Sequence, residues 1–129
     1  MAKYIRIDGT EYKIAITELK RRADILDRYA HRDENGILHR EVIGTYINYD
    51  LQLYCPPTPE GRATYNQLFD VLSAPVASHI VEMPNDGIAF EGYFSSIADA
   101  VDKIDDYGTR YKGLTCKLTA TRPRRVANG

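Results

Sequence analysis

The sequence contains few cysteines and few aromatic residues other than tyrosine. Its 129 residues include only two cysteines, Cys55 and Cys116, which excludes a disulfide framework. Each stands at an apolar position of an alternating segment, so we expect two buried free thiols. No histidine or other cysteine lies at metal-ligand spacing from either one, and the pattern predicts no metal site there.

Long apolar runs and an excess of charge of one sign are also missing. No run is long enough to span a bilayer, and the start, MAKYIRID, lacks the apolar core of a signal peptide. We therefore expect the chain to stay in the cytosol and to bind no membrane. The net charge is −1, which gives no general attraction to DNA or RNA and predicts no sequence-specific nucleic-acid partner.

Tyrosine is the abundant aromatic residue. Ten tyrosines stand beside three phenylalanines and no tryptophan. A tyrosine ring can be half covered while its hydroxyl finds a partner, which suits protein interfaces. The length predicts one domain over residues 1–129, large enough to have a single core.

One segment, from His39 to Cys55, alternates strictly in its second half. One face carries the apolar side chains Ile47, Tyr49, Leu51, Leu53 and Cys55, and the other carries Asn48, Asp50, Gln52 and Tyr54. A period of two predicts a β-strand with one buried face. The upstream turn signal Asn35-Gly36 makes it the returning strand of a long hairpin. So long a hairpin exceeds what a small domain needs for its own stability and suggests an assembly part.

The stretch from Ile16 to Ala30 is ambiguous. Ile16, Leu19, Ala23 and Leu26 have helical spacing, and the residue types favour a helix. A second set fits the alternation of a strand that would pair with the one after Gly36, namely Thr17, Leu19, Arg21, Ala23 and Ile25. The local signal alone favours the helix.

The remaining elements have local signals. Asp8-Gly9 predicts a tight hairpin over residues 4–14, and Pro84-Asn85-Asp86-Gly87 predicts one between residues 78–83 and 88–97. Thr58-Pro59-Glu60 starts a helix that Pro75 ends, with an apolar face of Tyr65, Leu68, Phe69 and Leu72. Residues 98–106 are a strand or a helical turn, residues 114–120 are a closing strand, and residues 121–129 are a frayed tail.

Candidate catalytic residues are few. His31 and His39 flank the Asn35-Gly36 turn near Glu41 and could form a metal or proton-relay site, although a solvated, charged tip is the favoured interpretation. No Gly-x-Ser-x-Gly motif occurs. The acidic run of Asp99, Asp102, Asp105 and Asp106 lacks the glycine and closing glutamate of a calcium loop. The sequence thus predicts no enzyme, no metal and no cofactor.

Two basic clusters lie at residues 20–22 and 122–125. If residues 20–22 form a strand, Arg21 shares the face of Leu19 and Ala23 while Lys20 and Arg22 point the other way. That division weakens a nucleic-acid interpretation and favours solvation or salt bridges between subunits.

Taken together, several segments resemble small tail-module proteins of phages and prophages of Gram-positive bacteria. These segments are HREVIGTYINYDLQL, LSAPVASHIVEMP, FEGYFSSI and YKGLTCKLTATRP. The order of elements is similar to the fold of phage tail-tube and distal tail proteins. The resemblance implies a mainly β (α+β) fold: an antiparallel β-sandwich or barrel, a flanking helix over about residues 59–73 and a hairpin arm over about residues 17–55. It also makes residues 16–30 a strand.

The resemblance further implies a non-enzymatic structural component that is made in the bacterial host cytoplasm and assembled into the virion tail. We expect a ring of identical subunits, a hexamer, formed through sheet edges and the arm, with other tail or baseplate proteins as partners. The expected subunit interface comprises Arg21, Arg22, Arg32, Asn35, His39, Arg40, Tyr46 and Tyr54. The position in the tail stays open between tube, tube end and baseplate adaptor.

Two other function classes remain as alternatives. One is a monomeric β-sandwich that binds carbohydrate or a receptor through exposed tyrosines. The other is a small hydrolase or metal-dependent enzyme built around His31, His39 and Glu41.

Overall fold

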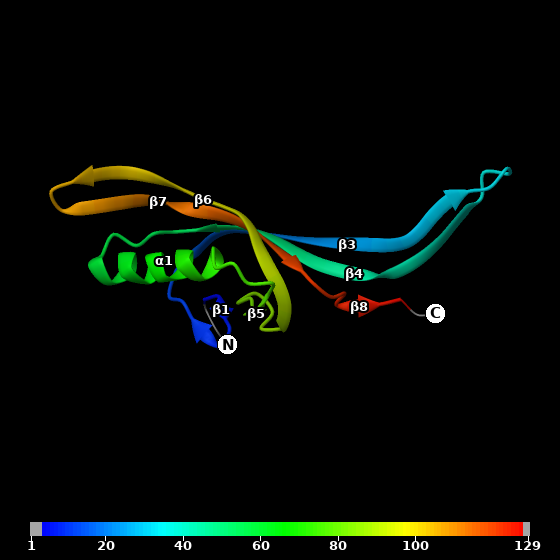
Figure 1. Cartoon of the computed structure of the whole chain (residues 1–129), viewed down its shortest axis with the longest axis horizontal. Helices are drawn as coiled ribbons and strands as arrows, with labels where there is room; N and C mark the ends of the chain where they lie inside the picture. The colour runs from blue at the N-terminus through cyan, green and yellow to red at the C-terminus, as the bar shows by residue number, and fades with distance from the viewer. Residues whose placement is uncertain (1–3, 128–129) are drawn as a thin grey trace.

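The computed structural model describes residues 4–127 and contains eight strands and one helix within that range. Several strands are much longer than a small domain requires, and two of them, residues 16–32 and 38–53, extend to one end of the molecule (Figure 1). The strands are β1 (Arg6–Ile7), β2 (Thr10–Glu11), β3 (Ile16–Arg32), β4 (Leu38–Leu53), β5 (His79–Glu82), β6 (Ala89–Asp105), β7 (Gly108–Ala120) and β8 (Arg125–Val126), and the helix is α1 (Pro59–Leu72).

All strands belong to one antiparallel sheet. Its hydrogen-bonded order is β2-β1-β5-β6-β7-β4-β3, with β8 paired to β4 beside this path. Helix α1, β1 and β5 lie on the same side of the long strands, and β6 bends sharply between its first half, which pairs with β5, and its second half (Figure 1). The bend coincides with a register shift between Ser95 and Ala98 and with a positive φ of 54° at Ser96. The predicted mainly β fold with one flanking helix and a long hairpin is confirmed.

The core lies between α1 and the middle of the sheet. Tyr65, Leu68 and Leu72 project from the helix, and they are buried together with residues of β4 and β7 such as Leu51 and Leu118. The helix begins as predicted, because the Thr58 hydroxyl accepts a hydrogen bond from the Gly61 amide at 3.0 Å. Both cysteines are buried and free, as expected.

The long hairpin is formed by β3 and β4. Residues 16–30 are strand, so the local preference for helix is overridden by pairing with β4. In this register Leu19 lies opposite Leu51 and Ala23 lies opposite Ile47, which puts these two residues on the core face, whereas Thr17 falls in a bulge. The hairpin lies within the predicted bounds of residues 17–55 except for one residue at its start.

A second long hairpin, formed by β6 and β7, extends toward the opposite end of the molecule (Figure 1). Residues 98–105 are strand, which settles the alternative that the sequence left open. In the turn, the Asp105 carboxylate accepts a hydrogen bond from the Tyr107 amide at 2.9 Å, and Gly108 has a φ of 116°. Near its base, the Tyr65 hydroxyl donates a hydrogen bond to Asp99 at 2.9 Å and so ties the hairpin to α1.

The chain after Thr121 differs from the expected frayed tail. Arg125 and Val126 pair with Thr45 and Gly44 of β4, and the Arg124 amide donates to the Thr45 carbonyl at 2.9 Å. Gly44 makes this approach possible, because a Cβ there would lie 2.5 Å from the Arg125 carbonyl oxygen. Residues 128 and 129 of the predicted tail lie outside the described part of the chain.

The hairpin of β1 and β2 is linked to β5 by a hydrogen bond to the buried His79. Asp8 and Gly9 both have positive φ, 51° and 86°, as the predicted tight turn requires. The Asp8 carboxylate accepts hydrogen bonds from the Ile80 amide at 2.9 Å and pairs with His79 Nδ1 at 2.7 Å. The sequence predicted that His79 would satisfy its nitrogens on backbone or water, whereas a carboxylate from another strand fills this role.

We expect Asp8 to make stability depend on pH on the acid side. Its hydrogen bond with His79, and then the one from Ile80, hold the pKa of Asp8 below 3.8. This stabilisation is present above the unfolded pKa and is lost as the pH falls through the folded pKa. Asp8 is half exposed, so the effect should stay below about 1 kcal/mol. Thermal melts between about pH 5 and pH 3 should fall less steeply for Asp8→Asn, which tolerates positive φ, than for the parent. Equal slopes would contradict this assignment.

Candidate assembly surface

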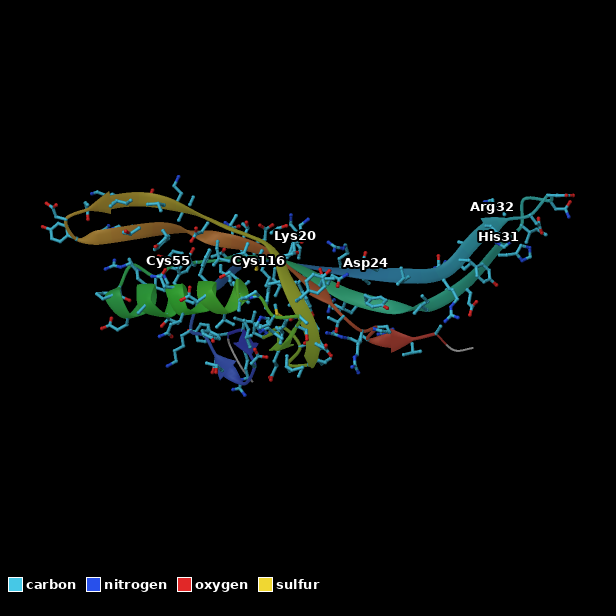
Figure 2. All side chains as sticks on the ribbon, viewed as in Figure 1. Lys20, Asp24, His31, Arg32, Cys55 and Cys116 are labelled. Carbon is cyan, nitrogen blue, oxygen red and sulfur yellow. The ribbon has the colours of Figure 1, made fainter. Side chains whose placement is uncertain are left out.

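The outer half of the β3–β4 hairpin, which we call the arm, is defined here as residues 28–41. Every side chain in it is exposed except Asp33, which is half-buried. Side chains project from both faces of the ribbon, as the labelled His31 and Arg32 illustrate (Figure 2). Apart from the ion pair of Arg40 with Asp27 at its base, the arm makes no side-chain hydrogen bond or ion pair with the rest of the described chain, so its side chains are available for contact with another molecule.

Asp33 organises the tip of the arm. Its Oδ1 accepts hydrogen bonds from the amides of Asn35 and Ile37 at 2.9 and 3.0 Å, and its Oδ2 lies 2.9 Å from His39 Nε2. The hydrogen bond with His39 is the main cause of the lowered pKa of Asp33. Arg32 donates to the Gly36 carbonyl at 2.8 Å. The tip therefore presents a defined shape rather than a loose loop.

His31 and His39 come together as the hairpin register requires. They are direct cross-strand partners, and their rings stack with centroids 5.4 Å apart. Glu41 approaches Arg28 at 3.9 Å. Within residues 4–127, no group of three or more histidine, cysteine, aspartate or glutamate side chains is arranged to hold a metal ion.

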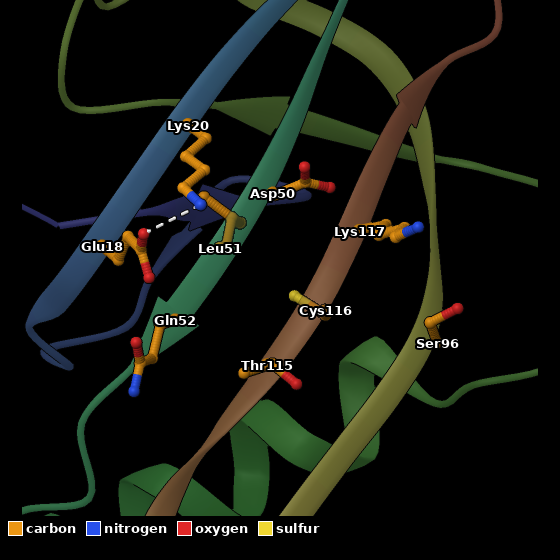
Figure 3. Close-up of a pocket in the computed structure, with 9 residues that line it drawn as sticks. All are labelled: Glu18, Lys20, Asp50, Leu51, Gln52, Ser96, Thr115, Cys116 and Lys117. Atoms are coloured by element: carbon orange, nitrogen blue, oxygen red, sulfur yellow. Dashed lines mark ion pairs between the residues drawn. The ribbon is translucent and has the colours of Figure 1, made fainter.

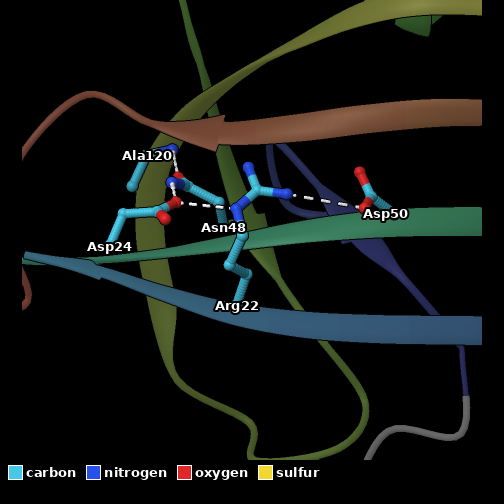
Figure 4. A network of polar contacts seen from close by, with 5 residues as sticks. All are labelled: Arg22, Asp24, Asn48, Asp50 and Ala120. Atoms are coloured by element: carbon cyan, nitrogen blue, oxygen red, sulfur yellow. Dashed lines mark hydrogen bonds and ion pairs between the residues drawn. The ribbon is translucent and has the colours of Figure 1, made fainter.

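A polar network fixes the base of the hairpin on the face away from the core (Figure 4). The Asn48 side chain donates to Asp24 at 2.6 Å and accepts from the Ala120 amide at 2.8 Å. Arg22 in turn donates to Asp24 at 2.8 Å and reaches Asp50 at 3.5 Å. Asn48 is buried, so this link holds β3, β4 and the end of β7 together where the hairpin leaves the core.

The predicted interface residues fall in separate places. Arg32, Asn35, His39 and Arg40 lie on the arm, where Arg40 also pairs with Asp27 at 2.8 Å. The others lie elsewhere: Arg21 faces the core side opposite Tyr49, Arg22 and Tyr46 occupy the other face, and Tyr54 follows the end of β4. The fold thus brings four of the eight together, and their contact with another subunit remains a prediction.

The hollow drawn in Figure 3 lies on the outer face of the sheet, between β3 and β6. Its lining carries charges of both signs, including Lys20, Asp50 and Lys117. Cys116 also lines it, but burial raises the pKa of that thiol to about 12, so it stays protonated at neutral pH. The lining contains no histidine. This arrangement offers no activated nucleophile.

Two exposed features were not predicted from the sequence. The exposed Arg125 and the half-buried Arg124 lie beside the base of the arm because the tail docks on Gly44, a glycine inside a strand pattern that could have signalled a close approach. The tip of the β6–β7 hairpin exposes Ile104 and Tyr107. No repeating pattern marks that tip, because neither of its faces is buried.

Two free sheet edges complete the surface. Within residues 4–127, β3 pairs with β4 alone, so its other edge carries backbone groups that are unpaired in this range from Ile16 to Arg32. On β6, pairing with β5 covers residues 89–92, and no other strand of the described chain covers the outer edge of the second hairpin. Long open edges of this kind are hazards in an isolated protein and are usually covered by another strand.

Comparisons with known proteins identify the fold. No family model and no curated protein matches the sequence. The architecture, with one antiparallel sheet, one helix and long hairpins, is similar to that of a solved phage protein. The crystal structure of the SPP1 Dit (gp 19.1) protein superposes on this chain with a TM-score of 0.55 and 10% sequence identity.

The match with Dit, a distal tail protein, covers 93% of this chain and 50% of the Dit chain. The chain therefore spans about half the length of the protein it matches. Dit is described as a paradigm of the hub adsorption apparatus in phages that infect Gram-positive bacteria. At this identity the likeness establishes a shared fold, as the sequence resemblance implied. Separately, no helix within residues 4–127 is long and apolar enough to cross a membrane.

Proposed function

We propose that this protein is a non-enzymatic structural component of a phage or prophage tail, and that identical subunits assemble into a ring, a hexamer. The tail assignment is supported by the fold shared with SPP1 Dit. The position in the tail is that of a tube, tube end or baseplate adaptor, with other tail or baseplate proteins as neighbours. The protein is made in the bacterial host cytoplasm and then enters the virion tail.

The exposed arm is the observation that carries this proposal. A two-stranded ribbon alone in water is marginally stable, yet β3 and β4 continue well beyond the core. Pairing of a free β3 edge with a neighbouring copy would cover its backbone groups. Because the two long hairpins extend to opposite ends of the molecule (Figure 1), a contact that joins unlike surfaces is favoured, and such contacts close into rings.

The size of the purified protein in solution tests the proposal. Light scattering coupled to size-exclusion chromatography should give a mass near six times 14.6 kDa as the concentration rises. Negative-stain images of the same fractions should show closed rings with a central opening. A strict monomer at every concentration, even when mixed with the products of neighbouring genes, would contradict the ring.

A further inference from the structure

The core-side face of the long hairpin bears a groove that is lined by arginines. Arg21, Arg124 and Arg125 line it together with Ala23, Ile25, Thr45 and Ile47, and its volume is about 460 Å³. The groove forms where the tail that follows β7 turns back to pair with β4 at Gly44. It therefore combines apolar side chains of the hairpin with guanidinium groups from two distant parts of the chain.

The charge of this groove is largely uncompensated. Arg124 pairs with Asp86 at 3.1 Å, while Arg21 and Arg125 form no ion pair within residues 4–127. None of the lining residues is acidic. In addition, Nη2 of Arg124 is buried and has no hydrogen-bond partner among the described residues. An acidic group with apolar neighbours would complement such a lining.

The tip of the β6–β7 hairpin has this complementary chemistry. Residues 101–107, Val-Asp-Lys-Ile-Asp-Asp-Tyr, contain three aspartates and one lysine, and the returning strand adds Arg110 opposite Lys103, so the acidic excess is confined to the turn itself. Lys103 pairs with Asp105 at 3.2 Å, which leaves Asp102 and Asp106 without an ion pair inside the described chain. Ile104 and Tyr107 are 73% and 85% exposed, so both side chains are available for contact with another molecule.

We propose that the acidic tip of the β6–β7 hairpin of one copy docks into the arginine groove of a second copy. The tip lies at one end of the molecule, and the groove lies on the other side of the core, beside β8 and the base of the arm, so no copy can fill its own groove (Figure 1). The contact joins unlike surfaces and repeats from copy to copy. This inference rests on the proposed ring and specifies which surfaces form it.

Charge reversal tests the contact directly. The groove variant Arg21→Glu with Arg125→Glu and the tip variant Asp102→Lys with Asp106→Lys should each weaken association about 10- to 100-fold in sedimentation velocity. An equimolar mixture of the two variants should regain rings, because it restores opposite charges at every contact. The chain that carries all four changes should form rings without either two-change variant being present. The matched control, Lys20→Glu with Lys117→Glu, makes the same charge change on the outer face and should assemble like the parent.

Cross-linking tests the same contact without requiring a complete ring. A mixture of Ala23→Cys and Tyr107→Cys proteins, oxidised with glutathione disulfide, should give a covalent dimer on a non-reducing gel. The buried Cys55 and Cys116 should stay free. Ala23→Cys mixed with Glu11→Cys, an exposed position on β2, should give none.

The outcomes separate this contact from the ring itself. If the parent forms rings and both reversal variants still do, the docking of tip into groove is overturned while the ring stands. If the parent stays monomeric and no cross-link forms, the ring and the docking contact are both overturned. A cross-link formed by a parent that is otherwise monomeric supports the contact and contradicts the ring. Binding of a DNA duplex that the groove variant loses, with cross-linking absent, would instead assign the groove to phosphate groups and overturn the proposal.

Discussion

Replacing residues 28–41 by Asn-Gly should abolish ring formation and leave the fold intact. Asp27 and Val42 are cross-strand partners, so they can flank the two-residue turn. The removed side chains are exposed or half-buried, and the free energy of unfolding of the monomer should change by less than about 1 kcal/mol. Light scattering and negative-stain imaging measure the assembly, and a thermal melt measures the fold.

A control for this shortening keeps the strands at full length. Glu34→Ser changes the turn without removing any strand residue and should assemble like the parent. Rings of unchanged size from the shortened chain would show that the arm has no role in assembly. A shortened chain that fails to fold would show that the arm stabilises the monomer even though its side chains are exposed.

Leu68→Ala should destabilise the monomer by about 2–5 kcal/mol. Leu68 is completely buried between α1 and the sheet, and its truncation removes apolar burial and leaves a cavity. Urea unfolding measures the loss, and it should be recorded at low protein concentration because assembly would add stability by mass action. The control Gln67→Ala, at the neighbouring exposed position, should change stability by less than about 0.5 kcal/mol. Similar midpoints for the two variants would contradict the core assignment.

Elements with local signals could be predicted from the sequence. The Thr58 cap, Pro59 and the apolar spacing up to Leu72 define α1 without reference to any other part of the chain. The same holds for the turns at Asp8-Gly9 and Asn35-Gly36, where the residue types themselves favour positive φ. In these cases the physical cause lies within a few residues.

Elements that depend on distant partners could not be derived in this way. Residues 16–30 have helical spacing, and they become strand because β4 pairs with them. Residues 98–106 are exposed along most of their length, so their sequence has no alternation of apolar and polar residues that would predict a strand. The hydrogen bond from Tyr65 to Asp99 links this segment to the core. The resemblance to tail proteins, rather than local propensity, supported a strand at residues 16–30.

The candidate surface was predicted only in part. The turn signal and the flanking histidines correctly located the charged tip of the arm and the approach of His31 to His39. The arginine groove was missed, since Arg21 and Arg125 are far apart in the sequence and meet through the docking of β8 at Gly44. A glycine within a strand is a weak signal that becomes informative once its partner is known.

The topology of the sheet also has a consequence for folding. The β3–β4 and β6–β7 hairpins join neighbouring segments and can form within microseconds. The pairs β1–β5 and β4–β7 join remote segments, so the core must wait for slower loop closure. During that interval both finished ribbons expose open edges to other nascent chains. Rapid synthesis at high temperature should therefore favour inclusion bodies, and slow synthesis in the cold should favour native protein.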